Sequence, residues 1–291
     1  MYKLKNSYID KMIEHKLSSC EIDFILYIAR YQDEAGCVES VYYKDVCEKI
    51  SISIQKFYDI IESLKGKGLI LAKKSRPSDI KIVLIGNSFE QVDFEHGKVP
   101  GYLNVAQNQF SKDEFREMKA GSKLLYLYSQ RFLNGKHMLV ENFYNDFCRI
   151  FQVSKKTLQY YVHELKEKKL LFISRKRNQY YHYEMTMKPS TVLFVIKDII
   201  PNEKSLYEDN IVHLIERNFK NYLPEPVSGY RQALHQIAGL ATQQRASEHS
   251  DFVSLIVSAI KSSLLQQKKE KKDNPVINAA LVNKWLSMAV T

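Results

Sequence analysis

An internal repeat over the first two thirds of the 291-residue chain constrains its fold more than any other feature. Two copies align without a gap at an offset of 101 residues. The matching segments are 24–31 with 125–132, 43–47 with 144–148, and 53–69 with 154–170. Chance could preserve apolar periodicity, but it would rarely also preserve the Tyr-x-Asp-x-Cys pattern of the middle segment. The sequence therefore predicts two copies of one structural module.

The first copy predicts three helices followed by two strands. Ser18 and Glu21 have the Ser-x-x-Glu spacing of a capping box, so a helix is expected to begin there. Ser53 is a good N-cap for a third helix, which two glycines end. The elements expected between and after these points are a strand at 41–43, helices at 44–50 and 53–66, and strands at 69–72 and 80–85.

The second copy predicts the same order of elements. They are helices at 122–132, 141–151 and 154–169, and strands at 170–174 and 181–187. Three helices followed by a hairpin with a basic loop is the pattern of a winged helix-turn-helix module. The expected fold class is therefore mainly α with small β-hairpin wings (α+β).

Four segments make up the expected domain organisation. Gly97 to Gly101 has the composition of a hinge between two winged-helix domains at 1–96 and 102–200. From residue 201 to 291, apolar residues recur at helical spacing, and Pro275 is expected to start a last helix. This C-terminal domain is predicted to be all-helical, and it contains no recognisable motif.

The distribution of charge favours a polyanionic partner. Lys and Arg exceed Asp and Glu by 43 to 33, a formal net charge of +10. Residues 53–81 hold seven Lys and Arg against three acids, and residues 154–182 hold eight against two. These two helix-and-wing segments carry an excess as large as that of the whole chain. Neutralising phosphates releases condensed counterions, so the basic segments are candidates for binding double-stranded DNA.

The predicted recognition helix of the second copy carries the side chains better suited to binding DNA. At 100° per residue, its inner face is expected to contain Leu158, Tyr161, Val162 and Leu165. Lys and Gln side chains on the outward face suit guanine and adenine edges, and the helix start and the wing suit phosphates. The candidate DNA-binding residues are Ser154, Lys155, Lys156, Gln159, Tyr160, His163, Lys166, Arg175, Lys176 and Arg177.

The first copy carries acids on the corresponding face. Its outward positions include Asp59 and Glu62, which would repel phosphate over roughly a Debye length of ~10 Å at low salt. Its candidate DNA-binding residues are Ser53, Gln55, Lys56, Lys73, Lys74 and Arg76.

Several classes of function lack support in the sequence. The four cysteines form no C-x-x-C pair and no cluster with histidine, so no metal site is expected, and Cys47 and Cys148 are expected to pack as small apolar residues. No nucleophile elbow or phosphate-binding glycine loop appears, and neither an enzyme nor a cofactor is predicted. Without a signal peptide or an apolar run of bilayer length, we expect a cytoplasmic protein that does not contact membranes.

The tandem arrangement resembles replication initiators of plasmids and phages from low-GC Gram-positive bacteria. The resemblance rests on the sequence segments 121–126 and 154–158 and covers roughly residues 18–188. Similar segments also occur in transcription regulators. It implies binding to repeated origin sequences, with one module serving dimerisation or a second DNA contact. It also implies that the C-terminal domain contacts a second copy or the replication or transcription machinery.

Two classes of function remain open at this point. The first is a sequence-specific DNA-binding protein of a mobile element, acting as a replication initiator or as a transcription or partition regulator. The second is an adaptor whose winged helices bind other proteins. Salt dependence separates them, because only phosphate binding loses affinity steeply as salt rises.

Overall fold

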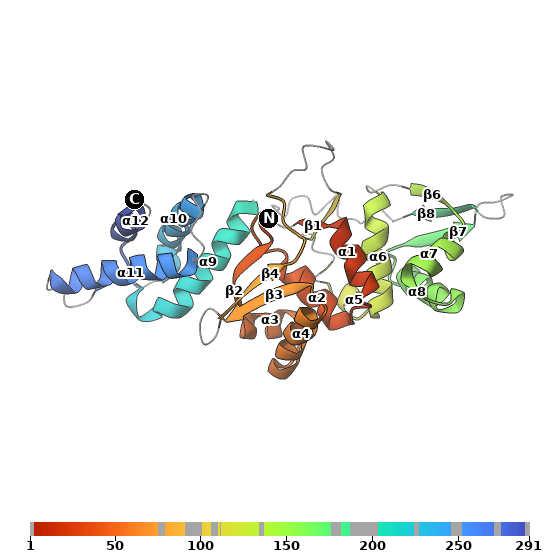
Figure 1. Ribbon diagram of the computed structural model, residues 1–291, viewed down its shortest axis with the longest axis horizontal. Coiled ribbons are helices and arrows are strands. Elements are labelled where there is room, and N and C mark those ends of the chain that lie inside the picture. Colours follow the sequence, from red (N-terminus) through yellow and green to blue (C-terminus); the bar gives the residue numbers. More distant parts are fainter. Residues whose placement is uncertain are drawn as a thin grey trace.

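The computed structural model shows a mainly helical protein with small antiparallel sheets. It describes residues 3–74, 79–90, 101–105, 110, 112–133, 137–175, 182–186, 203–223, 227–245, 252–270 and 275–288. The elements follow one long axis (Figure 1), with the N-terminal helices in the middle, the second repeat at one end and the C-terminal helices at the other. The predicted α+β class is confirmed at this level.

The chain begins with two elements that the sequence did not predict. Strand β1 (Lys3–Lys5) leads into helix α1 (Asn6–Glu14), which buries one apolar face. Strand β1 pairs antiparallel with β5 (Tyr102–Asn104), just after the predicted hinge. Of that hinge only Gly101 lies within the described residues, and its carbonyl accepts a 2.8 Å hydrogen bond from the Asn6 amide. Strands of three residues are too short to give a period-2 signal.

The first repeat follows the predicted order. Its elements are α2 (Ser19–Ile28), β2 (Cys37–Tyr42), α3 (Tyr43–Ile50), α4 (Ile54–Gly66), β3 (Ile70–Lys74) and β4 (Asp79–Leu84). The capping box is confirmed, since the Ser18 hydroxyl accepts from the Glu21 amide while the Glu21 carboxylate accepts from the Ser18 amide. The strand expected at 41–43 begins earlier, at Cys37, because β2 pairs with β4 from Asp79 to Val83 across an irregularity after Val38.

The second repeat has the same order and the same sheet topology. After a short helix α5 (Asp113–Arg116) come α6 (Ala120–Leu133), β6 (His137–Glu141), α7 (Phe143–Phe151), α8 (Lys155–Glu167), β7 (Phe172–Arg175) and β8 (His182–Thr186). The sheet orders are β2-β4-β3 and β6-β8-β7. The helix expected from Glu141 instead begins at Phe143. Glu141 pairs with His182 in the sheet, and Asn142 has a positive φ of 49°.

Equivalent backbone positions in the two repeats share unusual conformations. Ser51 and Gln152 end α3 and α7 in the left-handed region, with φ of 54° and 50°. Two residues later, the side chains of Ser53 and Ser154 cap α4 and α8 by accepting from backbone amides. This tight turn sets the angle between each pair of helices, so it fixes how the next helix is presented.

The buried apolar residues form two separate clusters. One extends from Leu4 to Met185 and joins the N-terminal segment to both repeats. The other contains only C-terminal residues, from Ile211 to Leu286. The two repeats therefore share a continuous core, whereas the C-terminal helices have their own.

The C-terminal part is helical wherever the structure describes it. Its elements are α9 (Glu203–Phe219), a 3-10 turn η3 (Lys220–Tyr222), α10 (Val227–Arg245), α11 (Phe252–Lys269) and α12 (Ala279–Met288). The last helix starts at Ala279 rather than Pro275, since the Asn278 side chain accepts a 3.1 Å hydrogen bond from the Leu281 amide as its cap. Among the described residues, no helix has the length and apolar character needed to cross a membrane.

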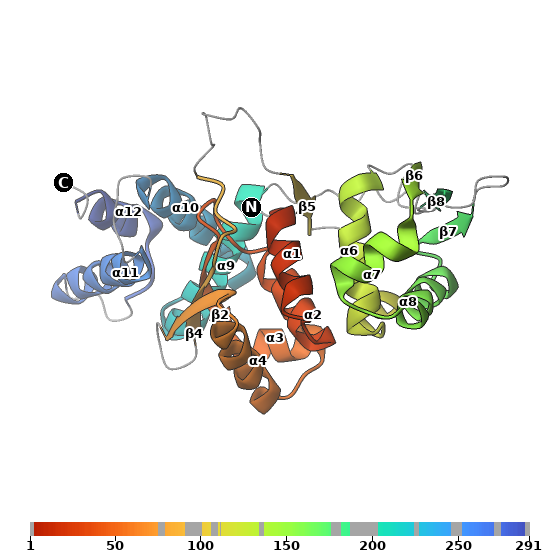
Figure 2. The same ribbon diagram turned by 45° about the vertical axis from the view of Figure 1, so that its right-hand side comes forward.

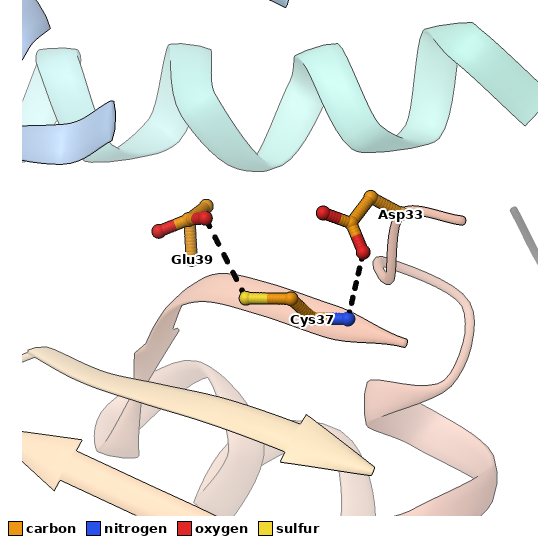
Figure 3. Close-up of side chains that lie close together, drawn as sticks. All are labelled: Asp33, Cys37 and Glu39. Atoms are coloured by element: carbon orange, nitrogen blue, oxygen red, sulfur yellow. Dashed lines mark hydrogen bonds between the residues drawn. The ribbon is translucent and has the colours of Figure 1, made fainter. Parts of the chain in front are cut away.

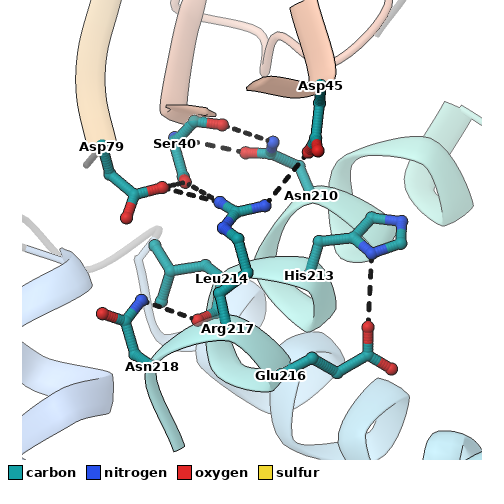
Figure 4. Close-up of polar contacts among 9 residues, drawn as sticks. All are labelled: Ser40, Asp45, Asp79, Asn210, His213, Leu214, Glu216, Arg217 and Asn218. Atoms are coloured by element: carbon teal, nitrogen blue, oxygen red, sulfur yellow. Dashed lines mark hydrogen bonds and ion pairs between the residues drawn. The ribbon is translucent and has the colours of Figure 1, made fainter. Parts of the chain in front are cut away.

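Helix α9 attaches the C-terminal part to the first repeat through polar side chains (Figure 4). Asn210 forms two hydrogen bonds with the backbone of Ser40, at 2.7 and 3.3 Å. The Arg217 guanidinium donates to the Ser40 hydroxyl at 2.7 Å and to the Asp79 carboxylate at 2.6 Å, and reaches Asp45 at 3.3 Å. It also lies 4.6 Å from the centroid of the Tyr42 ring. These contacts cover the edge strand β2.

Candidate nucleic-acid interface

Helix α8 presents a polar and basic face to solvent. Leu158, Val162 and Leu165 are buried, as the helical periodicity predicted. On the opposite side the residues proposed for DNA contact are all exposed: Lys155, Lys156, Gln159, Tyr160, His163 and Lys166. The exposed acid on this face is Glu167, at the far end of the helix, and it accepts from His163 at 3.1 Å. The first two turns therefore carry positive charge without an exposed acid.

The start of α8 is held by its own hydroxyl side chains. Ser154 is exposed, and its hydroxyl accepts a 3.1 Å hydrogen bond from the Thr157 amide. The Thr157 hydroxyl lies 2.8 Å from the same oxygen. The Lys155 ammonium lies 5.7 Å from the centroid of the Tyr144 ring, which belongs to α7. The first lysine of the helix is thus placed against the preceding helix, at the end where backbone amides favour an anion.

Tyr161 was predicted on the inner face, and it lies half-buried against the beginning of α6. A Cβ atom at Gly121 would overlap the Tyr161 ring, so the absence of a side chain there permits α6 and α8 to approach. Burial raises the pKa of the Tyr161 hydroxyl. Tyr161 is therefore a packing residue of the module, whereas its neighbour Tyr160 faces solvent.

Lys119 lies beside this face, and the sequence analysis did not single it out. Its ammonium is 4.2 Å from the centroid of the Tyr160 ring. A hydrogen bond with Tyr160 raises the pKa of Lys119, and the ammonium stays charged at neutral pH. Its backbone amide donates to the Glu164 carboxylate at 3.3 and 3.4 Å. Only the packing of the turn before α6 against α8 brings this lysine here, so no local pattern could reveal it.

The predicted wing residues are only partly within the described part of the chain. Arg175 is exposed at the end of β7, and Lys73 and Lys74 are exposed at the end of β3. The remaining proposed wing residues lie outside the described part of the chain: Arg76, Lys176 and Arg177. Strands β3 and β7, which precede the predicted wing loops in the chain, follow α4 and α8 respectively.

The equivalent face of α4 has a different character. Ser53, Gln55 and Lys56 are exposed as predicted, but the Gln55 amide donates to Asp59 at 2.8 Å. Glu62 pairs with Lys65 at 2.9 Å. Two apolar side chains on the same helix, Ile54 and Tyr58, are 51% and 42% exposed. This helix offers acids and apolar groups where α8 offers lysine, glutamine and histidine.

One cluster of potential metal ligands occurs among the described residues, at Asp33, Cys37 and Glu39 (Figure 3). The Asp33 carboxylate accepts from the Cys37 amide at 2.7 Å, and the Cys37 thiol lies 3.5 Å from Glu39. Lys81 forms an ion pair with Glu39 at 3.0 Å. Burial, and then the charge of Glu39, raise the pKa of the Cys37 thiol to about 12. A neutral thiol and a carboxylate already paired with lysine suit a structural turn better than a cation site.

The thiols of Cys47 and Cys148 are half-buried and free, in equivalent places on α3 and α7. Burial raises the pKa of both thiols, which disfavours the reactive thiolate. Their surroundings are consistent with packing.

Searches against known proteins give no further indication of function. No protein-family model, no curated protein and no solved structure matches this chain.

Proposed function

We propose that this chain is a sequence-specific double-stranded DNA-binding protein built on two tandem winged helix-turn-helix modules. The element order, the sheet orders β2-β4-β3 and β6-β8-β7, and the tight turns before α4 and α8 support this fold. In such modules the helix after the turn enters the major groove, and the wing lies along the backbone or minor groove.

The observation that carries the proposal is the outward face of α8. Lys156 and Gln159 are one helical turn apart and exposed, with bonding groups suited to guanine and adenine edges. Ser154 and Lys155 stand at the helix start, where phosphate contacts fix the register of the protein on DNA. At the places in α4 equivalent to Lys155, Gln159, Tyr160 and His163, the exposed residues are apolar or acidic: Ile54, Tyr58, Asp59 and Glu62. This difference supports a sequence-specific role for the second module.

The test is binding by the full chain to duplexes selected from a random pool. We expect Lys156→Ala, Lys176→Ala and Arg177→Ala together to weaken binding at least ~100-fold, because each good base or phosphate contact contributes about 1–3 kcal/mol. The matched control removes three exposed cations elsewhere, with Lys220→Ala, Arg231→Ala and Lys261→Ala. Wild-type affinity in the first triple variant would refute the assignment.

Within this class, we propose a replication initiator of a mobile element, on the resemblance described from the sequence. A transcription or partition regulator has the same binding chemistry. Mapping the bound sites separates the two: repeated sites beside the gene support initiation, and a single palindrome at a divergent promoter supports regulation.

The face of α4 favours a second function for the first module. Ile54, Tyr58, Asp59 and Glu62 suit a contact with protein more than with phosphate. If the whole chain is an adaptor, its interactions should persist from about 50 to 200 mM salt. A DNA contact through 6–10 phosphates loses about 10³–10⁵ in affinity over that range.

A further inference from the structure

The turn between α1 and α2 lies against the second repeat, although it belongs to the N-terminal segment. A pocket of about 190 Å³ lies at this junction, between the turn and the second repeat. Its lining includes Lys16 and Leu17 from the turn, Gly121 and Leu124 from α6, and Val153 and Tyr161 from the turn before α8 and from α8 itself. In Figures 1 and 2 this turn lies beside the beginning of α6, on the same lower side of the molecule as α8.

Lys16 is exposed at this junction, and its backbone is held in the left-handed region with φ of 47°. The neighbouring Leu17 and Ile13 are buried in the shared core, which fixes the turn on both sides of the lysine. The Lys16 amide donates to the Ile13 carbonyl at 3.0 Å, and the Leu17 amide donates to the Met12 carbonyl at 3.2 Å. The position of this cation relative to α8 is therefore set by packing.

The contact between the N-terminal segment and the second repeat is extensive and specific. The Lys123 ammonium on α6 is fully buried and donates to both carboxylate oxygens of Asp23 on α2, at 2.7 Å each. Arg131 donates to Asp10 of α1 at 2.6 Å. The Ser19 hydroxyl donates to the Met118 carbonyl at 3.2 Å. Because these contacts join one continuous core, α1, α2 and α8 keep a fixed arrangement.

We infer that Lys16 and Lys119 extend the DNA-binding surface of α8 and contact phosphates that flank the bases α8 contacts. This inference rests on the proposed function. Lys119 lies beside Tyr160 on one edge of the face, and Lys16 lies across the pocket that Tyr161 lines. With Lys155 and Lys156 on α8, the proposed surface draws its lysines from both sides of the predicted hinge.

The acidic residues near these lysines either have other partners or lie exposed at the end of α1. Glu164 accepts from the Lys119 amide, and Glu117 pairs with Lys168 at 3.0 Å. Glu14 is exposed at the end of α1, two residues before Lys16. An ammonium is a compact point charge that suits phosphate, and it carries no base preference. The N-terminal segment thus contributes affinity, and α8 contributes sequence preference.

The test measures how affinity for a selected duplex depends on salt. Each phosphate neutralised contributes about 0.9 to the slope of log Kobs against log salt concentration. We expect Lys16→Asn and Lys119→Gln each to reduce the slope by about 1, and the double variant by about 2, with unchanged base preference. Asparagine is chosen at position 16 because it tolerates a positive φ. Lys261→Gln on α11 is the matched control and should leave the slope unchanged.

Charge-retaining variants control for any effect of the substitutions on folding. Lys16→Arg and Lys119→Arg should keep the wild-type slope, and all variants should keep the wild-type melting temperature within a few degrees. If both neutral variants keep the wild-type slope while Lys156→Ala still weakens binding, the inference is wrong and the proposed function stands. If the wild-type chain binds no duplex in a salt-dependent way, the proposed function fails and the inference fails with it.

Discussion

Glu21 connects α2 to the C-terminal end of α4 through a single carboxylate. Besides capping α2, it accepts from the Ser63 hydroxyl at 2.7 Å and forms an ion pair with Lys67. Burial disfavours its charged form, but these hydrogen bonds and those from Ser18 outweigh burial and lower the pKa of Glu21 to about 2. A carboxylate held in this way stabilises the folded state only while it is ionised.

The first prediction follows from that lowered pKa. Because the folded-state value lies below the ordinary 4.5, the stabilisation is complete above about pH 4.5 and is lost as pH falls toward 2. A difference of this size corresponds to ~3 kcal/mol. Glu21→Gln should lower the free energy of unfolding by a similar amount at pH 7, and it should flatten the decline of stability in acid, measured by urea denaturation.

Glu62→Gln is the control for this prediction. Its carboxylate is exposed and pairs only at i,i+3 with Lys65, so its removal should change stability by less than about 0.5 kcal/mol. An acid-induced loss of stability that is identical in wild type and Glu21→Gln would contradict the assigned role of Glu21.

At the scale of elements, the repeat provides its own internal comparison. Helices α4 and α8 begin after equivalent capping serines, bury three equivalent positions, and follow the same left-handed turn. They differ in what they present to solvent. The shared features specify the fold, and the differences specify the proposed division of function.

Ser53→Ala and Ser154→Ala form a matched pair that tests this division. Each variant removes an N-cap, which should lower the free energy of unfolding by ~1 kcal/mol. Only Ser154→Ala should also weaken DNA binding, by several-fold, because it loosens the first turn of the helix that we propose contacts bases. The measurements are denaturant melts and duplex affinities for both variants. Equal losses of affinity in both would place α4 at the DNA as well.

The sequence reveals these helices because their signals are local. Apolar periodicity, a capping serine and the repeat itself located α3, α4, α7 and α8 to within about two residues. It also predicted which residues of α8 are exposed. The position of Lys119 could not be predicted, because it depends on the contact of Lys119 with Tyr160, 41 residues away in the chain. Strands β1 and β5 could not be predicted either, because three residues give no alternating pattern and each strand pairs with a distant partner.

The whole molecule is organised by two cores joined through polar contacts. The repeats share one apolar cluster, but α9 reaches the first repeat mainly through Asn210 and Arg217. A pocket of about 350 Å³ remains beside these side chains, lined by residues that include Tyr31, Glu48 and His213. Nothing in the local sequence pairs Arg217 with Asp79, which lies 138 residues away. The sequence therefore identified a helical C-terminal part without indicating how it is attached.

Arg217→Ala should detach the C-terminal helices without unfolding either core. The variant removes the cation that faces the buried Asp79 carboxylate, and loss of one partner from a buried pair costs about 3–5 kcal/mol. Because the two apolar clusters are separate, this cost should fall on the contact between α9 and β2. We expect faster hydrogen exchange at the Ser40 amide, which bonds to Asn210, while amides in the centre of α4 and α11 keep their protection. Arg231→Ala, on the exposed face of α10, should leave exchange unchanged, and uniform loss of protection in Arg217→Ala would mean that the two cores unfold as one unit.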